Sequence, residues 1–524
     1  MKTPFALLLS VLSTSCSLFQ EANSAYCTSD ADCTESALGK YCDTSTHSCS
    51  SPPPSPPPVV VPDLVLDDPS GKPIISGAVN TISGSGFVGT IAAAINGRPV
   101  TVVVVDGNTL QLTVPNLAFM RCGPLNIDVT RTLNGQSLTK NKLFNVNYTG
   151  INYVFSGRQA FSKNGVVSYV WDNFGYQQNQ SVPDLVTIDS QGNPGIEFHA
   201  AVGADYSLSL TPQSVGTAPT PRAIMLPGYY TQTQLDNKKK GLALISGLEG
   251  ATSPAFTTYD PSNGAATTQT LQLQSPVQQV VNDAVVFAPN STSLSEVLIA
   301  GKGGVFKLSP PYMTPKPVFP DGQFDANAQS LMISNYIDAT PRESVSSAVT
   351  STGPKIRIIY EVRPAPAPDP AITSTIGLPY GSISVAAPAA FKNNGVTNMQ
   401  YVFNENGIGL KYFSTSVGGA MSLMQTLNDN IPQKTSVKLD DLNCDGYPDI
   451  LVAAGKKILY YPSAGPSTYS VSTMTVLFDG STLTDNIERF SLWRDNVGGA
   501  AGLLVATKPM GVPTASVFVF QATP

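Results

Sequence analysis

The sequence predicts an all-β protein whose largest part is a seven-bladed β-propeller, preceded by a β-sandwich and a small disulfide-rich module. Strand–turn–strand units recur about every 50 residues in the C-terminal part, which is the length of one four-stranded blade. That part shows no apolar periodicity typical of long helices. Four cysteines crowd together near the N-terminus. At 524 residues the chain exceeds the size of one hydrophobic core, so we expect several folded units.

A targeting segment is predicted at residues 1–15. Lys2 precedes an apolar stretch much shorter than the ~20 residues needed to cross a bilayer, and small residues follow up to Cys16. This arrangement resembles a bacterial lipoprotein signal. The resemblance implies that Cys16 is lipidated and anchors the protein at the outer membrane or cell surface. Ordinary signal-peptidase cleavage after Ala25, which would release a secreted protein, is the alternative.

A cysteine-rich module is predicted at residues 16–49. Its four clustered cysteines are Cys27, Cys33, Cys42 and Cys49. So short a segment cannot bury a core, which favours two disulfides as covalent staples. Three pairings are open at this point. Zinc binding is the alternative, although the segment lacks a Cys-x-x-Cys pair.

A proline-rich linker follows at residues 50–62. Consecutive prolines favour the extended polyproline helix, which makes a semi-rigid spacer. We expect this spacer to hold the rest of the molecule away from the membrane, or simply to join two domains.

The β-sandwich is predicted at residues 63–149. Short β-rich runs are separated by turn pairs typical of hairpins: Asn96-Gly97, Asp106-Gly107 and Asn134-Gly135. The run SGSGF, the pair NGRPVTVV and LTVP, and the closing F-x-V-x-Y resemble the IPT/TIG immunoglobulin-like family. The resemblance implies an immunoglobulin-like sandwich that serves as a stalk or a binding module. Cys122 has no nearby partner in the sequence, and we expect a buried core thiol.

The propeller is predicted at residues 150–524. Its repeated unit is a short apolar strand, a turn with Gly or Asn, and a second strand of alternating polarity. Clear copies begin at Pro183, Gly241, Glu296, Met399, Pro448 and Gly502, and a weaker copy begins at Lys355. One such unit cannot bury both faces of its sheet, whereas radial stacking can. A further stack of sandwiches is the alternative, but the period is short for domains of about 90 residues.

One loop in this region carries specific chemistry, the run LDDLNCDGYPDILVA at residues 439–453. Oxygen donors fall at alternate positions, and Gly446 permits a sharp turn. The predicted ligands are Asp441, Asn443, Asp445, Tyr447 through its backbone carbonyl, and Asp449. Such a donor set suits a hard cation with roughly six to eight ligands, and calcium fits better than magnesium. Val452 stands where an EF-hand would need Glu.

This loop, D-x-N-x-D-G-x-x-D followed by Ile-Leu-Val, closely resembles the FG-GAP/VCBS repeat of integrin-α-like propellers. The resemblance implies that the loop binds calcium between the strands of one blade, and that the ion stiffens the loop. Cys444 replaces the usual Gly, and we expect its side chain to point away from the ion. The first unit keeps Asp172, Asn173 and Asp184 at a longer spacing, so a second calcium site there stays open.

The composition excludes some functions and leaves others open. A net charge of -6 and the lack of a basic stripe argue against nucleic-acid binding. The only histidines are His47, expected in a solvated loop, and His199, expected to be half-buried on a strand, so histidine-based catalysis is disfavoured.

We therefore expect a non-catalytic surface or adhesion protein that displays a calcium-stabilised propeller to an extracellular glycan or protein. The alternative is an exported carbohydrate-active enzyme, a hydrolase or lyase, that uses propeller carboxylates. Candidate carboxylates are Glu296, Glu361 and Glu405. A scaffold role within a larger surface assembly is a third hypothesis.

Overall fold

The computed structural model contains two compact units, residues 1–63 and 64–524. It describes residues 27–33, 41–51, 62–67, 73–115, 122–147, 154–155, 157–176, 182–190, 194–202, 206–220, 222–248, 253–271, 281–287, 294–301, 304–317, 328–335, 342–349, 355–362, 371–377, 385–393, 396–405, 409–416, 422–427, 431, 434–465, 468–494 and 501–522. The predicted signal, Cys16 and most of the proline-rich linker lie outside these residues.

The N-terminal unit is held together by two disulfides. It contains a 3-10 turn η1 (Asp30–Cys33) and a hairpin of β1 (Tyr41–Asp43) and β2 (Ser48–Ser50). The bonds are Cys27–Cys42 and Cys33–Cys49, which selects one of the three pairings that the sequence left open. The four half-cystines are its buried cluster. The disulfides thus take the place of a side-chain core, as predicted.

The second unit begins with nine strands. They are β3 (Val65–Leu66), β4 (Ile74–Ile75), β5 (Val79–Ser85), β6 (Thr90–Ile95), β7 (Arg98–Asp106), β8 (Thr109–Thr113), β9 (Leu125–Leu133), β10 (Gln136–Phe144) and β11 (Val146–Asn147). Seven of them pair in the order β10-β9-β6-β7-β8-β5-β3, and β11 pairs with β4 in parallel. Strand β7 changes partner along its length, from β6 to β8.

The predicted turn pairs lie where hairpins form in this region. The connections β6–β7, β7–β8 and β9–β10 close at these positions. Asn96 and Asn134 adopt positive φ angles of 47° and 52°, each followed by a glycine that also has positive φ. This conformation is required by the tight hairpin turns whose twist matches that of the strands. Immunoglobulin-like topology remains a prediction.

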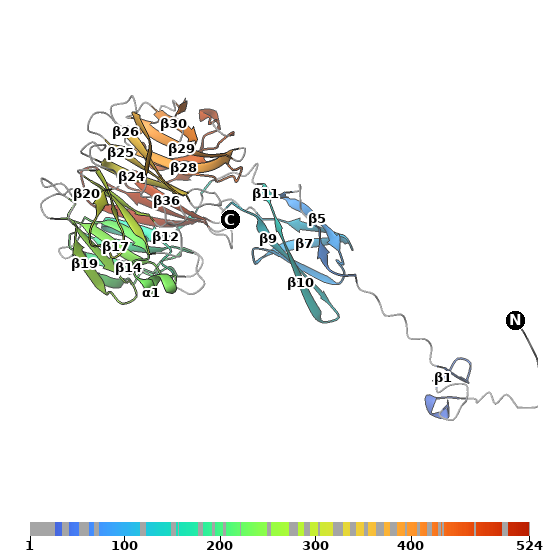
Figure 1. Cartoon of the computed structure of the whole chain (residues 1–524). Helices are drawn as coiled ribbons and strands as arrows, with labels where there is room; N and C mark the ends of the chain where they lie inside the picture. The colour runs from blue at the N-terminus through green and yellow to red at the C-terminus, as the bar shows by residue number, and fades with distance from the viewer. Residues whose placement is uncertain are drawn as a thin grey trace, which may run out of the picture. The chain divides into compact units, whose positions relative to one another are not determined.

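The rest of the second unit is a β-propeller of antiparallel sheets. Five sheets have four strands each: β16–β19, β20–β23, β24–β27, β28–β31 and β32–β35. One has seven, in the order β15-β14-β13-β12-β38-β37-β36. The first strand of each sheet contacts the first strand of the next, from β12 through β16, β20, β24, β28 and β32 to β36. In Figure 1 the chain passes from green through yellow and orange to red, and β36 returns to the neighbourhood of β12.

These strands have the following bounds: β12 (Gly157–Asp172), β13 (Asp184–Asp189), β14 (Gly195–His199), β15 (Gln213–Thr217), β16 (Ile224–Gly228), β17 (Gly241–Ser246), β18 (Ala255–Tyr259), β19 (Ala266–Thr270), β20 (Val281–Phe287), β21 (Glu296–Gly301), β22 (Gly304–Leu308), β23 (Lys316–Pro317), β24 (Ala328–Asn335), β25 (Arg342–Val349), β26 (Lys355–Val362), β27 (Ala371–Gly377), β28 (Val385–Asn393), β29 (Val396–Glu405), β30 (Gly409–Ser416), β31 (Ser422–Leu427), β32 (Lys434–Asp440), β33 (Asp449–Ala454), β34 (Lys457–Tyr461), β35 (Thr475–Asp479), β36 (Ile487–Arg494), β37 (Ala501–Thr507) and β38 (Ala515–Ala522). The short helix α1 (Gln232–Asp236) and the 3-10 turn η2 (Val471–Thr473) complete the described elements.

Strand β12 joins the two ends of the propeller. Its first half pairs with β38, from Gly157 opposite Ala522 to Val166 opposite Ala515. Its second half pairs with β13, ending with Asp172 opposite Asp184. One strand thus hydrogen-bonds the last strand of the chain to the first sheet, which removes two exposed sheet edges.

Where the structure describes the burial of a propeller sheet, the second strand is the most buried. Every residue of β17 and β37 is buried, as are five of the six residues in β13, β21 and β33. These strands are the apolar runs from which the repeat was predicted, because strands covered on both faces read as continuous apolar sequence.

The weak copy at Lys355 was assigned to the wrong strand. It is β26, the third strand of its sheet, and the second strand is β25. The sequence of β25, RESVSSAV, is too polar to match the repeat.

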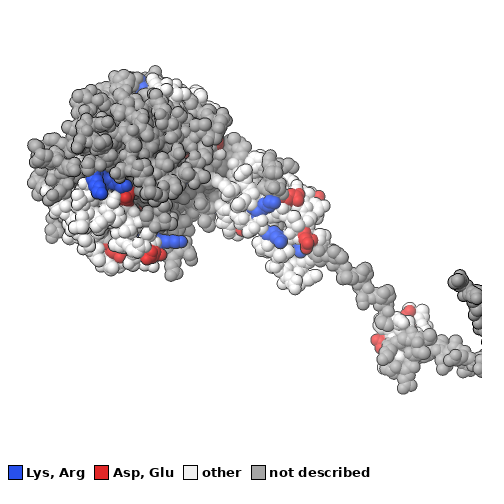
Figure 2. All heavy atoms as spheres, viewed as in Figure 1, with Lys and Arg blue, Asp and Glu red and all other residues white. Residues whose placement is uncertain are grey.

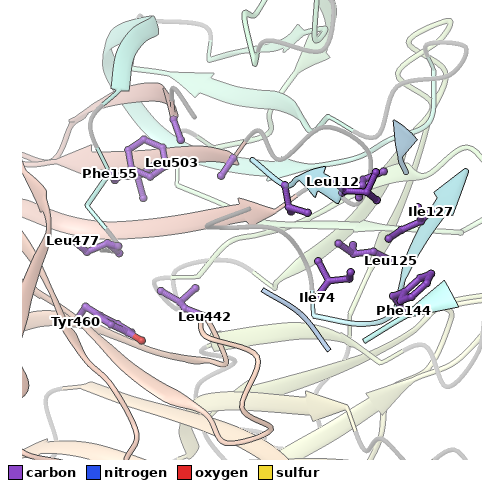
Figure 3. Close-up of a cluster of buried hydrophobic side chains, with 14 of the residues drawn as sticks. Ile74, Leu112, Leu125, Ile127, Phe144, Phe155, Leu442, Tyr460, Leu477 and Leu503 are labelled. Atoms are coloured by element: carbon purple, nitrogen blue, oxygen red, sulfur yellow. The ribbon is translucent and has the colours of Figure 1, made fainter. Parts of the chain in front are cut away.

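One hydrophobic cluster contains buried residues of both the first nine strands and the propeller. Figure 3 shows Ile74, Leu112 and Ile127 from the first group, and Leu442 and Leu477 from the propeller. Leu442 lies in the predicted metal loop and is fully buried. The loop is therefore anchored in the hydrophobic cluster through one of its own side chains.

The described surface carries few charges. On the face shown in Figure 2, basic and acidic side chains lie scattered among uncharged ones. Among the residues that the structure describes, no helix is long and apolar enough to span a membrane.

Candidate metal-binding loop

The predicted metal loop connects the first two strands of one propeller sheet. Strands β32 and β33 pair up to the rung of Asp440 and Asp449, and the loop spans the residues between them. Gly446 has a φ of 90°, and Cys444 has a φ of 57°. Both angles lie in the left-handed region that allows a tightly curled backbone and that non-glycine residues rarely adopt.

Side chains within the loop hold its curl. Oδ1 of Asn443 accepts the backbone N–H of Asp445 at 3.0 Å, and Oδ1 of Asp445 accepts that of Tyr447 at 2.8 Å. Oδ2 of Asp441 accepts the N–H of Gly446 at 3.0 Å. The donors predicted from alternate positions are thus brought into one turn, as Asx-type side chains commonly do.

Asp441 carries an acceptor atom without a donor. Its Oδ1 is buried and has no hydrogen-bond partner in the part of the chain that the structure describes. Burial, and after it the nearby charge of Asp445, raise the pKa of Asp441 to about 6 against the opposing effects of the Gly446 N–H and Arg494. A buried carboxylate oxygen of this kind is costly unless it meets a proton or a cation.

Asp449 lies at the base of the loop and is completely buried. Its Oδ1 accepts the N–H of Ser463 at 2.8 Å, and its Oδ2 accepts the N–H of Leu442 at 2.8 Å and the hydroxyl of Tyr460 at 3.2 Å. Burial, together with the charges of Asp441 and Asp445, raises its pKa to about 7 against the two backbone hydrogen bonds that it accepts. Asp449 therefore fixes both ends of the loop.

The donor chemistry fits a hard cation, although the carboxylates do not fully converge. Among the described residues, the only three metal-capable side chains within 4.8 Å of one another are Cys27, Cys33 and Cys42. Those sulfurs are disulfide-bonded and are not available as zinc thiolates. Ligation by all three loop aspartates would draw them closer together. A cation at this loop would give the Oδ1 of Asp441 a partner and would lower the raised pKa values of Asp441 and Asp449.

The corresponding loop of the first sheet also has a buried aspartate where its second strand begins, but a positively charged side chain lies beside it. Asp184 is buried, accepts the N–H of Ala201 at 2.8 Å and that of Phe174 at 3.3 Å, and has a pKa raised by burial to about 6. The ammonium of Lys240 lies 2.7 Å from Oδ2 of Asp172. Asn173 accepts the N–H of Gly175. A lysine thus supplies positive charge beside the second candidate site.

Arg494 has the matching position beside the metal loop. Its guanidinium pairs with Asp440 and donates to the backbone carbonyl of Asp441 at 2.8 Å. Arg494 is the last residue of β36, and Lys240 directly precedes β17. Each cation therefore comes from the sheet that follows the one whose loop it contacts. Sequence reasoning predicted neither ion pair, since each cation lies more than fifty residues from the carboxylate that it pairs with.

Two predictions about single residues were wrong. Cys122 is exposed and forms a disulfide with Cys444, 322 residues away, so it is not a buried thiol. His199 is buried rather than half-buried. Its Nδ1 lies 3.0 Å from the carbonyl of Ser209, and burial lowers its pKa, which favours the neutral ring.

The other residues singled out from the sequence contact neighbouring protein groups or have side chains outside the described residues. His47 is exposed, with Nδ1 3.1 Å from the carbonyl of Cys27. Glu296 pairs with Lys307 at 3.0 Å and accepts the hydroxyl of Ser309 at 2.8 Å. The side chains of Glu361 and Glu405 lie outside the described residues.

The chain resembles several solved structures, but the sequence identities and TM-scores are low. No protein-family model and no curated protein matches the chain. Among solved structures, an auxiliary nutrient binding protein from Bacteroides thetaiotaomicron is 12% identical, with 74% of this chain and 96% of that chain covered and a TM-score of 0.31. The six-bladed fucose-binding lectin of Aleuria aurantia is 12% identical over 57% of this chain and 91% of that chain, with a TM-score of 0.32. An ancestral GH74 enzyme is 10% identical over 86% and 72%, with a TM-score of 0.36. At such low scores, the likeness gives no basis for assigning a function.

Proposed function

We propose that this chain is an exported, calcium-stabilised β-propeller that binds an extracellular glycan or protein without catalysing a reaction. The observation that carries the calcium part is the metal loop, where the buried Oδ1 of Asp441 has no partner among described residues. Asp449 adds a second buried carboxyl whose pKa is raised. Calcium at Asp441, Asn443, Asp445, the Tyr447 carbonyl and Asp449 would offset both costs. The likeness to FG-GAP/VCBS repeats is part of the same proposal.

We also propose that the propeller has seven blades. The seven-stranded sheet divides at β12 into two sets of four strands, since the first half of β12 completes β36–β38 and its second half begins β13–β15. With the five four-stranded sheets this makes seven. In such a ring, the pairing of β12 with β38 closes the circle by hydrogen bonds between the two ends of the propeller.

Export is supported by the cysteines. Three disulfides connect six of the seven cysteines, and such bonds persist in oxidising, extracytoplasmic compartments. The remaining cysteine is Cys16, which we propose as the lipid-anchored N-terminus. The proposed anchor, cysteine-rich module, proline-rich spacer and IPT/TIG-like domain would then display the propeller outside the cell.

Binding is favoured over catalysis by the surroundings of the candidate catalytic groups. His199 is buried against the ring of Phe161, with centroids 4.9 Å apart, and its pKa is lowered by burial. Glu296 is engaged by Lys307 and Ser309. Groups used in this way stabilise strands and lack the access to substrate that acid–base chemistry requires.

The test uses the full chain after signal removal on a glycan array and against a panel of polysaccharides in a hydrolysis assay. We expect saturable binding to one glycan class or to a surface protein, with no turnover. Turnover that is lost on substitution of a single Glu or Asp would overturn the binding proposal. Calcium is tested separately by titration calorimetry on protein stripped with a chelator, where a lack of binding would overturn the metal assignment alone.

A further inference from the structure

A disulfide connects the metal loop to the strands that precede the propeller. Cys444 is the fourth residue of the loop counted from Asp441, and Cys122 lies three residues before β9. The bond crosses 322 residues of sequence. The loop is therefore tied at its middle to the segment that leads into β9.

The backbone at Cys444 indicates that the tether matters for the loop conformation. Its φ of 57° lies in the left-handed region, where glycine would be the default residue. A cysteine with an unfavourable backbone conformation is explained when its sulfur has a fixed partner. The tether then selects the curled form of the loop that gathers the oxygen donors.

Three further contacts act on nearby residues of the loop. The carbonyl oxygen of Asp441 accepts from Arg494 Nη1 at 2.8 Å and lies 3.0 Å from Sγ of Cys122. That sulfur carries no proton in the disulfide, so the second contact is packing. Leu442 is buried in the cluster that also contains Ile74 and Leu112. Three nearby loop positions, 441, 442 and 444, are thus held from outside the loop.

We propose that the Cys122–Cys444 disulfide, with Arg494, is a positioning latch for the metal loop, so that calcium affinity depends on the attachment of this loop to residues 64–147. This inference rests on the proposed calcium site. A ligand set held in place loses less conformational freedom on binding than a flexible one, and such outer contacts commonly change metal affinity by about 10-fold to 100-fold.

The coupling is reciprocal. If the closed latch favours calcium, bound calcium must favour the closed latch by the same factor. Reduction by a dithiol proceeds by thiolate attack on one sulfur, release of the other as a thiolate that takes up a proton, and cyclisation of the reagent to its own disulfide. The two electrons pass from the dithiol to the two cysteines. Calcium is expected to slow this reaction at Cys122–Cys444 and to leave Cys27–Cys42 unaffected.

The experiment compares calcium titrations of the wild-type protein, Cys122→Ser/Cys444→Ser, and the matched control Cys27→Ser/Cys42→Ser. We expect about 10-fold weaker binding or more in the first variant and wild-type binding in the control. Equal affinity in all three proteins would overturn the latch and leave the calcium site standing. Wild-type protein that binds no calcium would overturn both.

A second variant distinguishes the effect of losing the disulfide from the effects of misfolding and of backbone strain at position 444. Cys122→Ser/Cys444→Gly restores the residue that the left-handed angle favours while removing the bond. Its near-ultraviolet circular dichroism reports whether the tertiary packing is retained. If this variant is folded and binds calcium as tightly as the wild-type protein, the tether has no positioning role. Weaker binding with retained packing supports the latch.

Discussion

Oδ2 of Asp449 accepts a 2.8 Å hydrogen bond from the backbone N–H of Leu442, which joins the two ends of the metal loop. The same relationship recurs in the first sheet, where Asp184 accepts the N–H of Phe174. Each aspartate begins the second strand of its sheet and is buried. Asp184 and Asp449, each preceded by a proline, thus have a structural role that does not depend on a metal.

Asp449→Ala is expected to destabilise the protein by about 3 kcal/mol even in a chelator, because it leaves the N–H groups of Leu442 and Ser463 and the hydroxyl of Tyr460 without their acceptor. Urea unfolding measures the loss. The matched control is Asp479→Ala on β35, whose half-exposed pair with Lys457 contributes less than about 1 kcal/mol. Equal losses in both variants would contradict the structural role of Asp449.

Calcium is expected to raise the melting temperature of the protein, by the equivalent of about 2.7 kcal/mol when its concentration is a hundred times the dissociation constant. Asp445→Ala should remove most of this gain, since it deletes one proposed ligand from an exposed position without opening a core. Differential scanning calorimetry with and without calcium makes the measurement. Asp479→Ala should retain the full gain. A melting curve that calcium leaves unmoved would exclude the site.

The free energy of unfolding should depend on pH through the titration of Asp184. Its pKa is raised from 3.8 to about 6 by burial, so between these values the native state binds more protons than the unfolded state. The free energy of unfolding must therefore fall as the pH rises through this window, by at most about 3 kcal/mol. Asp184→Asn removes this contribution. In chelator, the wild-type curve should drop relative to the variant between about pH 4 and 6, and parallel curves would refute the assignment.

Closure by β12 makes its first half important for stability. Phe161 lies in that half, is 4% exposed, and contacts the ring of His199 edge-on. Phe161→Ala is expected to cost about 3 to 5 kcal/mol through the cavity that it creates. The control Val103→Ala, at a valine that is 53% exposed on β7, should cost less than about 0.5 kcal/mol. Chemical denaturation of both variants compares them, and similar midpoints would argue against tight packing at the closure.

Features encoded in short stretches could be predicted from the sequence. The apolar second strands at Asp184, Leu242 and Asp449 are visible because strands buried on both faces need continuous apolar residues. The hairpin turns at Asn96 and Asn134 are visible because few residues tolerate positive φ. Where a strand is polar, as in β25, the same reasoning fails.

The sequence by itself determined the repeated strands, the disulfide-rich segment and the order of oxygen donors in the metal loop, since each is a local pattern imposed by backbone geometry and burial. Only the tertiary structure decided that Cys122 pairs with Cys444, that Arg494 reaches Asp441, and that Lys240 pairs with Asp172. The physical reason is distance along the chain. These partners meet only after the sheets have packed, and no local propensity records which distant residue will arrive.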